Sequence, residues 1–276
     1  MAPFAPVTYL FVPGDRPERF DKALASGADR VILDLEDAVA PDDKARARST
    51  IAAWLATSAV ARDRVLVRIN DASTPWHADD LNLLRQIQPC AVMLPKCEAE
   101  HQIVAVLSCL TAAATVVVLI ESARGVAALP GIAGTPGVSR LAFGALDYMV
   151  DLDVPSDSPA LTHAAIQIAV ASRAAGLPKP IAGVTPDMVA TRVTSDMHEA
   201  MAVGFGAKMC IHPLQVAAVC QAITPSEQEI VWAQRVLLAW KTGAGGVLQV
   251  DGKMVDRPVV LKAERIISRT VHASNS

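Results

Sequence analysis

Long apolar runs are absent from the sequence, and so is any block of like charge. None of its apolar stretches reaches the roughly 20 residues that a transmembrane helix needs. The first residues, MAPFAPVTYLFVPGDR, lack the basic and long apolar segments of a secretory signal. With a formal net charge of −3, nucleic acids and anionic membranes are poor candidates for the main partner. These absences predict a cytosolic protein that acts on a small molecule.

Cysteine is scarce, and its spacing shows no pairs. The cysteines are Cys90, Cys97, Cys109, Cys210 and Cys220. They are odd in number and form no C-x-x-C motif, so neither disulfides nor a structural zinc site is expected. The six histidines show no paired spacing either, and MHEAM (197–201) lacks the second histidine of a zinc-protease helix. A site for a soft metal is therefore disfavoured.

Eight short apolar runs alternate with helix-like segments along the chain. The runs are TYLFVP (8–13), RVILDLE (30–36), VLVRIN (65–70), CAVMLPK (90–96), TVVVLIES (115–122), RLAFGALD (140–147), PIAGV (180–184) and AKMCIH (207–212). Nearly continuous apolar strands between helices indicate a parallel sheet that is covered on both faces, and eight such units close into a barrel. The expected fold is of the α/β class, a (β/α)8 TIM barrel over residues 1–223.

Residues 224–276 are expected to form a helical and hairpin extension of the barrel. Thr224-Pro225-Ser226-Glu227 is a helix-start signal, just as Asp15-Arg16-Pro17-Glu18 predicts an acidic N-cap for the first helix. Asp251-Gly252 predicts the turn of a short strand pair, and a last helix is predicted from Pro258 to about Val271. The extension is short for a core of its own, so we expect it to pack on the barrel or to reach into a neighbouring subunit.

Polar side chains stand where the predicted strands end. They lie in Gly14-Asp15-Arg16, Asp34-Leu35-Glu36-Asp37, Arg68-Ile69-Asn70, Lys96, Glu121-Ser122, Asp147 and His212. Because the functional groups of a barrel gather at the carboxyl ends of its strands, these acids and bases are expected to meet. Carboxylate oxygens suit Mg²⁺, which leaves positions to water and substrate, and arginines bind carboxylates or phosphates. The pattern predicts a metal-bound anionic substrate.

Single members of this set have plainer explanations. Asp34 can pair with a lysine or arginine inside the barrel, and Glu36 can be the anion that Arg68 requires without any substrate. Lys96 is typical of a reactive amine or of an ordinary ion pair. The constellation therefore carries the argument more than any one residue does.

Six motifs in order give the sequence a family likeness. They are LFVPGDRPERFDKALASGADRVILDLEDAV, VRIND followed by TPWHADDL, VMLPKCE, LIESARGV, FGALDYMVDL and GAKMCIHPLQV. Together they resemble the citrate lyase β-subunit-like family of CoA-thioester lyases, which includes malyl-CoA and citramalyl-CoA lyases and belongs to the phosphoenolpyruvate/pyruvate superfamily. The resemblance covers almost the whole chain. It implies a TIM barrel, usually a homotrimer, that uses Mg²⁺ for a reversible Claisen-type cleavage.

The resemblance also implies roles for the polar residues. Glu121 in LIES and Asp147 in FGALD match the two direct Mg²⁺ ligands of the family. Arg68 in VRIN matches the arginine that holds the carboxylate of the 2-oxo acid. Glu36 and Asp37 in DLED match acids that hold metal-bound waters and orient this arginine.

Further positions complete the comparison with the family. Arg16 matches a position near the substrate carboxylate and the pantetheine path, and Lys96 is a candidate substrate-binding residue. Asp256, in DGKMVDRPVV, matches the catalytic acid that longer members insert into a neighbouring subunit. One position departs from the pattern, because Ala182 stands where many relatives carry aspartate before the glycine. This departure makes the seventh side of the pocket less polar and leaves the substrate open.

The expected activity is Mg²⁺-dependent cleavage of a 3-hydroxyacyl-CoA thioester, such as citramalyl-CoA, malyl-CoA or citryl-CoA, to acetyl-CoA and a 2-oxo acid. One alternative is the β subunit of a citrate lyase complex that acts on an acyl-carrier-protein thioester. Another is a class II aldolase that uses free pyruvate and an aldehyde. A ligand-binding protein without activity is disfavoured, because Arg68, Glu121 and Asp147 are all present.

Overall fold

The computed structural model describes residues 5–58, 63–242 and 248–273. The chain divides into two compact units, of which one spans Pro6–Val219 and the other begins at Cys220. Within the first unit, eight parallel strands follow one another in sequence order and close into a barrel. The predicted (β/α)8 TIM barrel is therefore confirmed.

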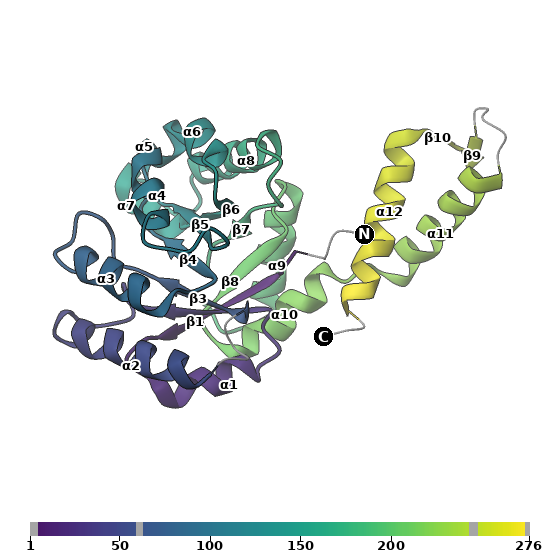
Figure 1. Cartoon of the computed structure of the whole chain (residues 1–276). Helices are drawn as coiled ribbons and strands as arrows, with labels where there is room; N and C mark the ends of the chain where they lie inside the picture. The colour runs from purple at the N-terminus through teal and green to yellow at the C-terminus, as the bar shows by residue number, and fades with distance from the viewer. Residues whose placement is uncertain (1–4, 59–62, 243–247, 274–276) are drawn as a thin grey trace. The chain divides into compact units, whose positions relative to one another are not determined.

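Each predicted apolar run forms one strand of the barrel. The strands are β1 (Thr8–Pro13), β2 (Arg30–Asp34), β3 (Val65–Arg68), β4 (Ala91–Leu94), β5 (Thr115–Ile120), β6 (Val138–Phe143), β7 (Ile181–Ala182) and β8 (Ala207–Cys210). Strand β1 closes the barrel, because Tyr9 is paired with Arg30 of β2 on one side and with Met209 of β8 on the other. Figure 1 shows this closure where the purple β1 lies beside the green β8.

Helices follow the strands and surround the barrel (Figure 1). They are α1 (Phe20–Leu24), α2 (Lys44–Thr57), α3 (His77–Ile87), α4 (Glu100–Leu107), α5 (Ala123–Ala127), α6 (Leu129–Gly134), α7 (Ala145–Leu152), α8 (Pro159–Ala174), α9 (Ala190–Ala202) and α10 (Pro213–Ile223), with 3-10 turns η1 (Pro17–Arg19) and η2 (Pro41–Asp43). In the part of the chain that the structure describes, no helix is long and apolar enough to cross a membrane.

Apolar side chains from all eight strands fill the interior of the barrel. They are Tyr9, Ile32, Leu66, Met93, Val117, Leu119, Ala142, Ile181, Ala207 and Met209. Because side chains alternate between the two faces of a strand, the other residues of each strand meet the surrounding helices. Full burial of a large aliphatic side chain contributes about 1.5–3 kcal/mol. This interior therefore stabilises the scaffold on which the charged residues at the strand ends are mounted.

The two predicted helix starts are present, but the polar contacts at each of them differ from the predicted ones. Asp15 is not an N-cap, because Arg16 precedes η1 and the Asp15 carboxylate instead pairs with Arg46 at 3.3 Å. In the second signal the capping pair is Ser226 and Glu229, not Thr224 and Glu227. The Glu229 N–H donates to Ser226 Oγ at 3.2 Å, and the Ser226 N–H donates to Glu229 Oε2 at 2.9 Å. Both starts are real, but their polar partners differ from the predicted ones.

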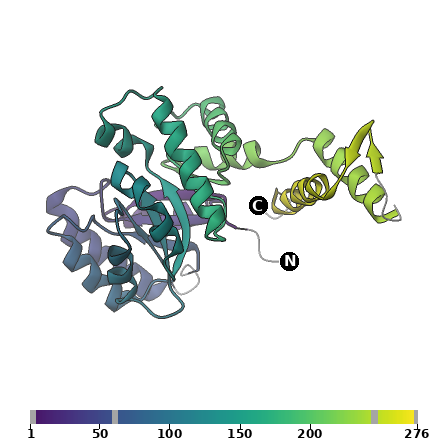
Figure 2. The same ribbon diagram turned by 90° about the horizontal axis from the view of Figure 1, so that it is seen from above.

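The second unit is a helical hairpin with a small strand pair. Its elements are α11 (Glu227–Thr242), β9 (Leu248–Val250), β10 (Lys253–Val255) and α12 (Arg257–Ala273). The two helices lie side by side in both views (Figures 1 and 2). The predicted turn is present, with positive φ at Asp251 and Gly252. Contrary to expectation, the unit has an apolar core of its own, in which Ala233, Val236 and Val260 are fully or almost fully buried.

Candidate active site

A cavity of about 310 Å³ opens where the barrel strands end. Its polar lining consists of Asp34 and Asp37 at and after the end of β2, Arg68 at the end of β3, Glu121 directly after β5 and Asp147 in α7, which follows β6. Its apolar lining includes Val184, Met209 and Ile211 after β7 and at the end of β8. The wall formed after β7 and at the end of β8 is thus apolar, while the charged side chains come from the other strands and from α7.

Asp34 and Arg68 form a bidentate ion pair at the ends of β2 and β3. Arg68 Nε and Nη2 donate to the two Asp34 carboxylate oxygens at 2.7 and 2.6 Å. Burial alone raises the pKa of Asp34, but the charge and hydrogen bonds of Arg68 outweigh this effect and lower it. Two parallel N–H donors fix the plane of the guanidinium, and the Phe11 ring lies 4.7 Å from its centre. The sequence left this pairing as one explanation of Asp34, and the geometry confirms it.

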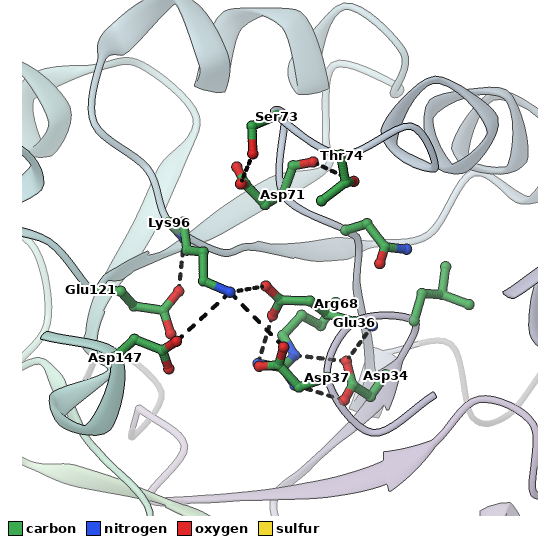
Figure 3. Close-up of polar contacts among 12 residues, drawn as sticks. Asp34, Glu36, Asp37, Arg68, Asp71, Ser73, Thr74, Lys96, Glu121 and Asp147 are labelled. Atoms are coloured by element: carbon green, nitrogen blue, oxygen red, sulfur yellow. Dashed lines mark hydrogen bonds and ion pairs between the residues drawn. The ribbon is translucent and has the colours of Figure 1, made fainter. Parts of the chain in front are cut away.

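Glu36 connects two cations across the mouth of the barrel. Its Oε2 lies 2.8 Å from Arg68 Nη1, and its Oε1 accepts a hydrogen bond from Lys96 Nζ at 2.8 Å (Figure 3). Asp37 lies farther out, 3.5 Å from Arg68 Nη1, with more than half of its side chain exposed. Burial raises the pKa of Glu36, although Arg68 and Lys96 oppose the shift. Glu36 and Asp37 therefore contact Arg68 as expected, but Asp34 holds it most closely.

Lys96 lies between two groups of acids (Figure 3). Besides Glu36, its Nζ faces Asp37 at 3.9 Å and Asp147 at 3.8 Å. Burial opposes its charge, but the hydrogen bond to Glu36 and the surrounding acids raise the pKa of Lys96. Its φ of +47° is uncommon for a residue other than glycine. This conformation lets the Lys96 N–H donate to Glu121 Oε2 at 2.8 Å, so backbone and side chain bind different acids.

Glu121 and Asp147 face the cavity from the ends of β5 and β6. Glu121 follows β5 directly and is buried, whereas Asp147 is partly exposed in the first turn of α7 rather than in the predicted strand 140–147. Burial raises the pKa of Glu121 to about 8, and the negative charges of Glu36 and Asp147 add to this shift. The site thus holds five carboxylates against the two cations Arg68 and Lys96.

Gly144 is a contributor that the sequence reading did not single out. It lines the cavity between β6 and α7, and a Cβ placed on it would stand 2.4 Å from Glu121 Oε1. Only a residue without a side chain leaves this carboxylate in place. The glycine in FGALD, at a junction of strand and helix and three residues before an acid, was the available signal.

Four predicted site residues are not among those that line the cavity. Glu36 and Lys96 form ion pairs with Arg68 and Asp147 of the lining. Arg16 precedes η1 with an exposed side chain and forms an ion pair with Asp15 at 3.7 Å. Asp256 belongs to the second unit, where it is exposed and accepts a hydrogen bond from the Val259 N–H at 3.2 Å at the start of α12. Their functional assignments remain predictions.

The fold and this charged cavity are those of a (β/α)8-barrel enzyme whose active site lies at the carboxyl ends of the strands. Residues 8–213 match the HpcH/HpaI aldolase/citrate lyase family, and the chain belongs to that family. Members of this family are lyases, among them citrate lyase β subunits and malyl-CoA lyases.

Relatives match the chain over nearly its whole length. It is 35% identical to the citrate lyase subunit beta-like protein of Mycobacterium tuberculosis, over 97% of this chain and 96% of that one. It is 31% identical to the L-malyl-CoA/beta-methylmalyl-CoA lyase of Cereibacter sphaeroides, over 94% and 92%. The crystal structure of CitE from Mycobacterium tuberculosis in complex with magnesium, acetoacetate and coenzyme A matches with a TM-score of 0.86 at 34% identity, over 97% and 98% of the two chains.

Proposed function

We propose that the protein is a Mg²⁺-dependent lyase that cleaves a 3-hydroxyacyl-CoA thioester to acetyl-CoA and a 2-oxo acid. The substrate would be of the citramalyl-CoA, malyl-CoA or citryl-CoA type. The observation that carries the proposal is the meeting of Glu121 and Asp147 with Arg68 around one cavity. Carboxylates that can hold a hard cation there stand beside a guanidinium that can bind a carboxylate. The related CitE complex with magnesium, acetoacetate and coenzyme A supports this assignment.

The residues present fit Mg²⁺ in three respects. All candidate ligand atoms are oxygens, as Mg²⁺ prefers. The acids outnumber the cations, and the raised pKa of Glu121 reflects a burial that an added cation would offset. Glu36 Oε2 is buried and lies 2.8 Å from Arg68 Nη1 but accepts no hydrogen bond of regular geometry, so a metal-bound water could donate to it.

In this proposal Glu121 and Asp147 hold the ion, and Glu36 and Asp37 hold its waters. Bound Mg²⁺ would polarise the hydroxyl oxygen that becomes the carbonyl oxygen of the 2-oxo acid and favour transfer of its proton to a carboxylate of the site or to water. Arg68, kept planar by Asp34, neutralises the carboxylate of the departing 2-oxo acid. Lys96, held by Glu36, would contact another substrate oxygen.

Cleavage leaves an acetyl-CoA enolate that requires a proton. We assign this proton donation to Asp256 of a neighbouring chain in a homotrimer, with residues 224–276 reaching into that neighbour. Arg16, which is exposed, is assigned to the path of the CoA substrate.

The test is mass-spectrometric detection of acetyl-CoA from the purified protein with citramalyl-CoA, malyl-CoA and citryl-CoA in parallel, with Mg²⁺ or with EDTA. We expect Mg²⁺-dependent release from one of the three, and the accompanying 2-oxo acid identifies the substrate. The variant Asp147→Asn, which keeps the shape of the side chain, is the matched inactive control. If protein that binds Mg²⁺ releases nothing from any of them, the proposal fails, and acyl-carrier-protein thioesters and free pyruvate with an aldehyde are the next substrates to assay.

Gly144→Ala tests the position of Glu121 without changing any charge. Because the new methyl group would overlap Glu121 Oε1, the carboxylate must move. We expect Mg²⁺ affinity, measured by isothermal titration calorimetry, to fall about 10–100-fold. Gly134→Ala in α6 is the control, because a Cβ there meets no atom within 4 Å. Equal Mg²⁺ affinity in the two variants would contradict the assignment of Glu121 as a ligand.

A further inference from the structure

A buried lysine, Lys44, binds the loop after β2 but does not line the cavity. Lys44 begins α2, and only 4% of its surface is exposed. Its Nζ donates three hydrogen bonds of 2.7 Å each, to the carbonyl oxygens of Leu35 and Glu36 and to Asn70 Oδ1. An ammonium group has three donors, so each of them is used.

The direct partners of Lys44 Nζ are uncharged oxygens, two of them backbone carbonyls and one a side-chain amide oxygen. Burial lowers the pKa of Lys44, and the charge of Asp34 is the largest opposing influence. A buried cation is costly unless hydrogen bonds compensate for lost water, and here neutral oxygens and the Trp76 ring, 5.0 Å away, do so. A lysine placed in this way stabilises the position of backbone carbonyl groups and does not directly neutralise the charge of another side chain.

The third acceptor of Lys44 belongs to a network that returns to α2. Both the backbone N–H and Nδ2 of Asn70 donate to Asp80 Oδ2 at 2.7 Å. The other oxygen of Asp80 accepts from Arg48 Nη1 at 3.0 Å, and Arg48 lies one helical turn after Lys44. The loop after β2, the end of β3, α2 and α3 are thereby tied together by buried polar contacts.

The loop held by Lys44 carries side chains of the active site. The two carbonyl groups that it binds flank the backbone of Glu36, whose carboxylate bridges Arg68 and Lys96 at 2.8 Å each. Asn70 follows Arg68 by two residues, so the same ammonium group also fixes the strand end that presents Arg68. A rotation of either peptide group at Glu36 would displace its carboxylate from both cations.

We propose that Lys44 is a positioning residue that holds the backbone around Glu36 and the end of β3 in the arrangement needed to bind the divalent cation and the substrate carboxylate. The proposal rests on the proposed Mg²⁺-dependent function. It assigns Lys44 no contact with substrate or metal, because its effect is transmitted through Leu35, Glu36 and Asn70.

The test is Lys44→Met, which keeps the length of the side chain and removes its donors. Calorimetric titration with Mg²⁺ alone is expected to show affinity reduced about 10–100-fold, the usual effect of removing a group that orients ligands. Hydrogen exchange of the amides of residues 35–39 should accelerate, while exchange in β5 stays unchanged. In turnover assays kcat should fall and KM for the acyl-CoA should rise, because the cation and the substrate carboxylate are both held less well. Lys22→Met, at an exposed lysine on α1, is the matched control and should leave all three measurements at wild-type values.

Asn70→Ser is a second variant that leaves the two carbonyl contacts of Lys44 in place, and it should change the same measurements in the same direction. Asn70→Ser replaces Lys44→Met as the test if Lys44→Met does not fold. Wild-type Mg²⁺ affinity and loop exchange in folded Lys44→Met, or in Asn70→Ser where the first does not fold, would overturn the positioning role and leave the lyase proposal intact. A wild-type protein that binds no Mg²⁺ would overturn both proposals together.

Discussion

Replacing Arg68 with methionine is expected to lower the free energy of unfolding by about 3–5 kcal/mol, the usual effect of removing one partner of a buried ion pair. Arg68 is 8% exposed, and its loss would leave Asp34 and Glu36 buried without their main counter-charge. Lyase turnover should be abolished as well, since the group proposed to neutralise the substrate carboxylate is gone. Urea unfolding and acetyl-CoA release measure the two effects separately.

Arg68→Lys separates charge from geometry at the same position. A lysine keeps the positive charge, but its single nitrogen cannot reproduce the two parallel bonds to Asp34. We expect a smaller loss of stability and a fall in kcat of about 100-fold or more.

Arg140→Met controls for the loss of a buried arginine elsewhere in the barrel. Arg140 lies in β6, is 3% exposed, and its Nε donates to the carbonyl oxygen of Lys179 before β7. Its removal should lower stability but leave kcat unchanged in the folded fraction. Equal kcat values for Arg68→Lys and Arg140→Met would contradict the proposed role of Arg68.

The barrel could be predicted because its signal is repeated and local. Each strand is a short apolar run, such as TVVVLI in β5, and the alternation with helices leaves few arrangements besides a closed parallel sheet. The helix starts were less predictable, since Asp15 has several possible partners and the fold brings Arg46 to it. Sequence spacing alone does not show which distant cation a carboxylate meets.

The meeting of the acids at one cavity could also be predicted, because the ends of parallel strands share one rim. Which acid binds which cation, and from which element, could not be predicted. Asp34 turned out to be the closest partner of Arg68, and Asp147 stands on α7 and not in a strand. The burial of Lys44 could not be predicted, because the segment DDKARAR is typical of the solvent-exposed start of a helix. Its burial depends on how α2 packs beside the loop after β2 and the end of β3.

Replacing Glu121 with glutamine is expected to stabilise the metal-free protein at high pH while abolishing its response to Mg²⁺. The pKa of Glu121 is raised from 4.5 to about 8 in the folded chain. Between these two pH values the folded state keeps a proton that the unfolded state releases, so the free energy of unfolding falls as pH rises. Below pH 4.5 both states are protonated, and the wild type loses no stability through this group. At 1.36 kcal/mol per pH unit, the loss above pH 8 amounts to at most about 5 kcal/mol.

Glutamine cannot ionise, so the difference in the free energy of unfolding between the wild type and Glu121→Gln reports on Glu121. The contributions of Asp34, whose pKa is lowered, and of Glu36, whose pKa is raised, are present in both proteins. Urea unfolding in EDTA at pH 5 and pH 9 should show that the free energy of unfolding of the variant increases relative to that of the wild type as pH rises. Addition of Mg²⁺ at 100 times its dissociation constant should then stabilise the wild type by about 2.7 kcal/mol and leave the variant unchanged. A variant that tracks the wild type in EDTA would show that Glu121 is ionised in the folded chain without metal. A variant that still gains stability from Mg²⁺ would instead move the cation site away from Glu121.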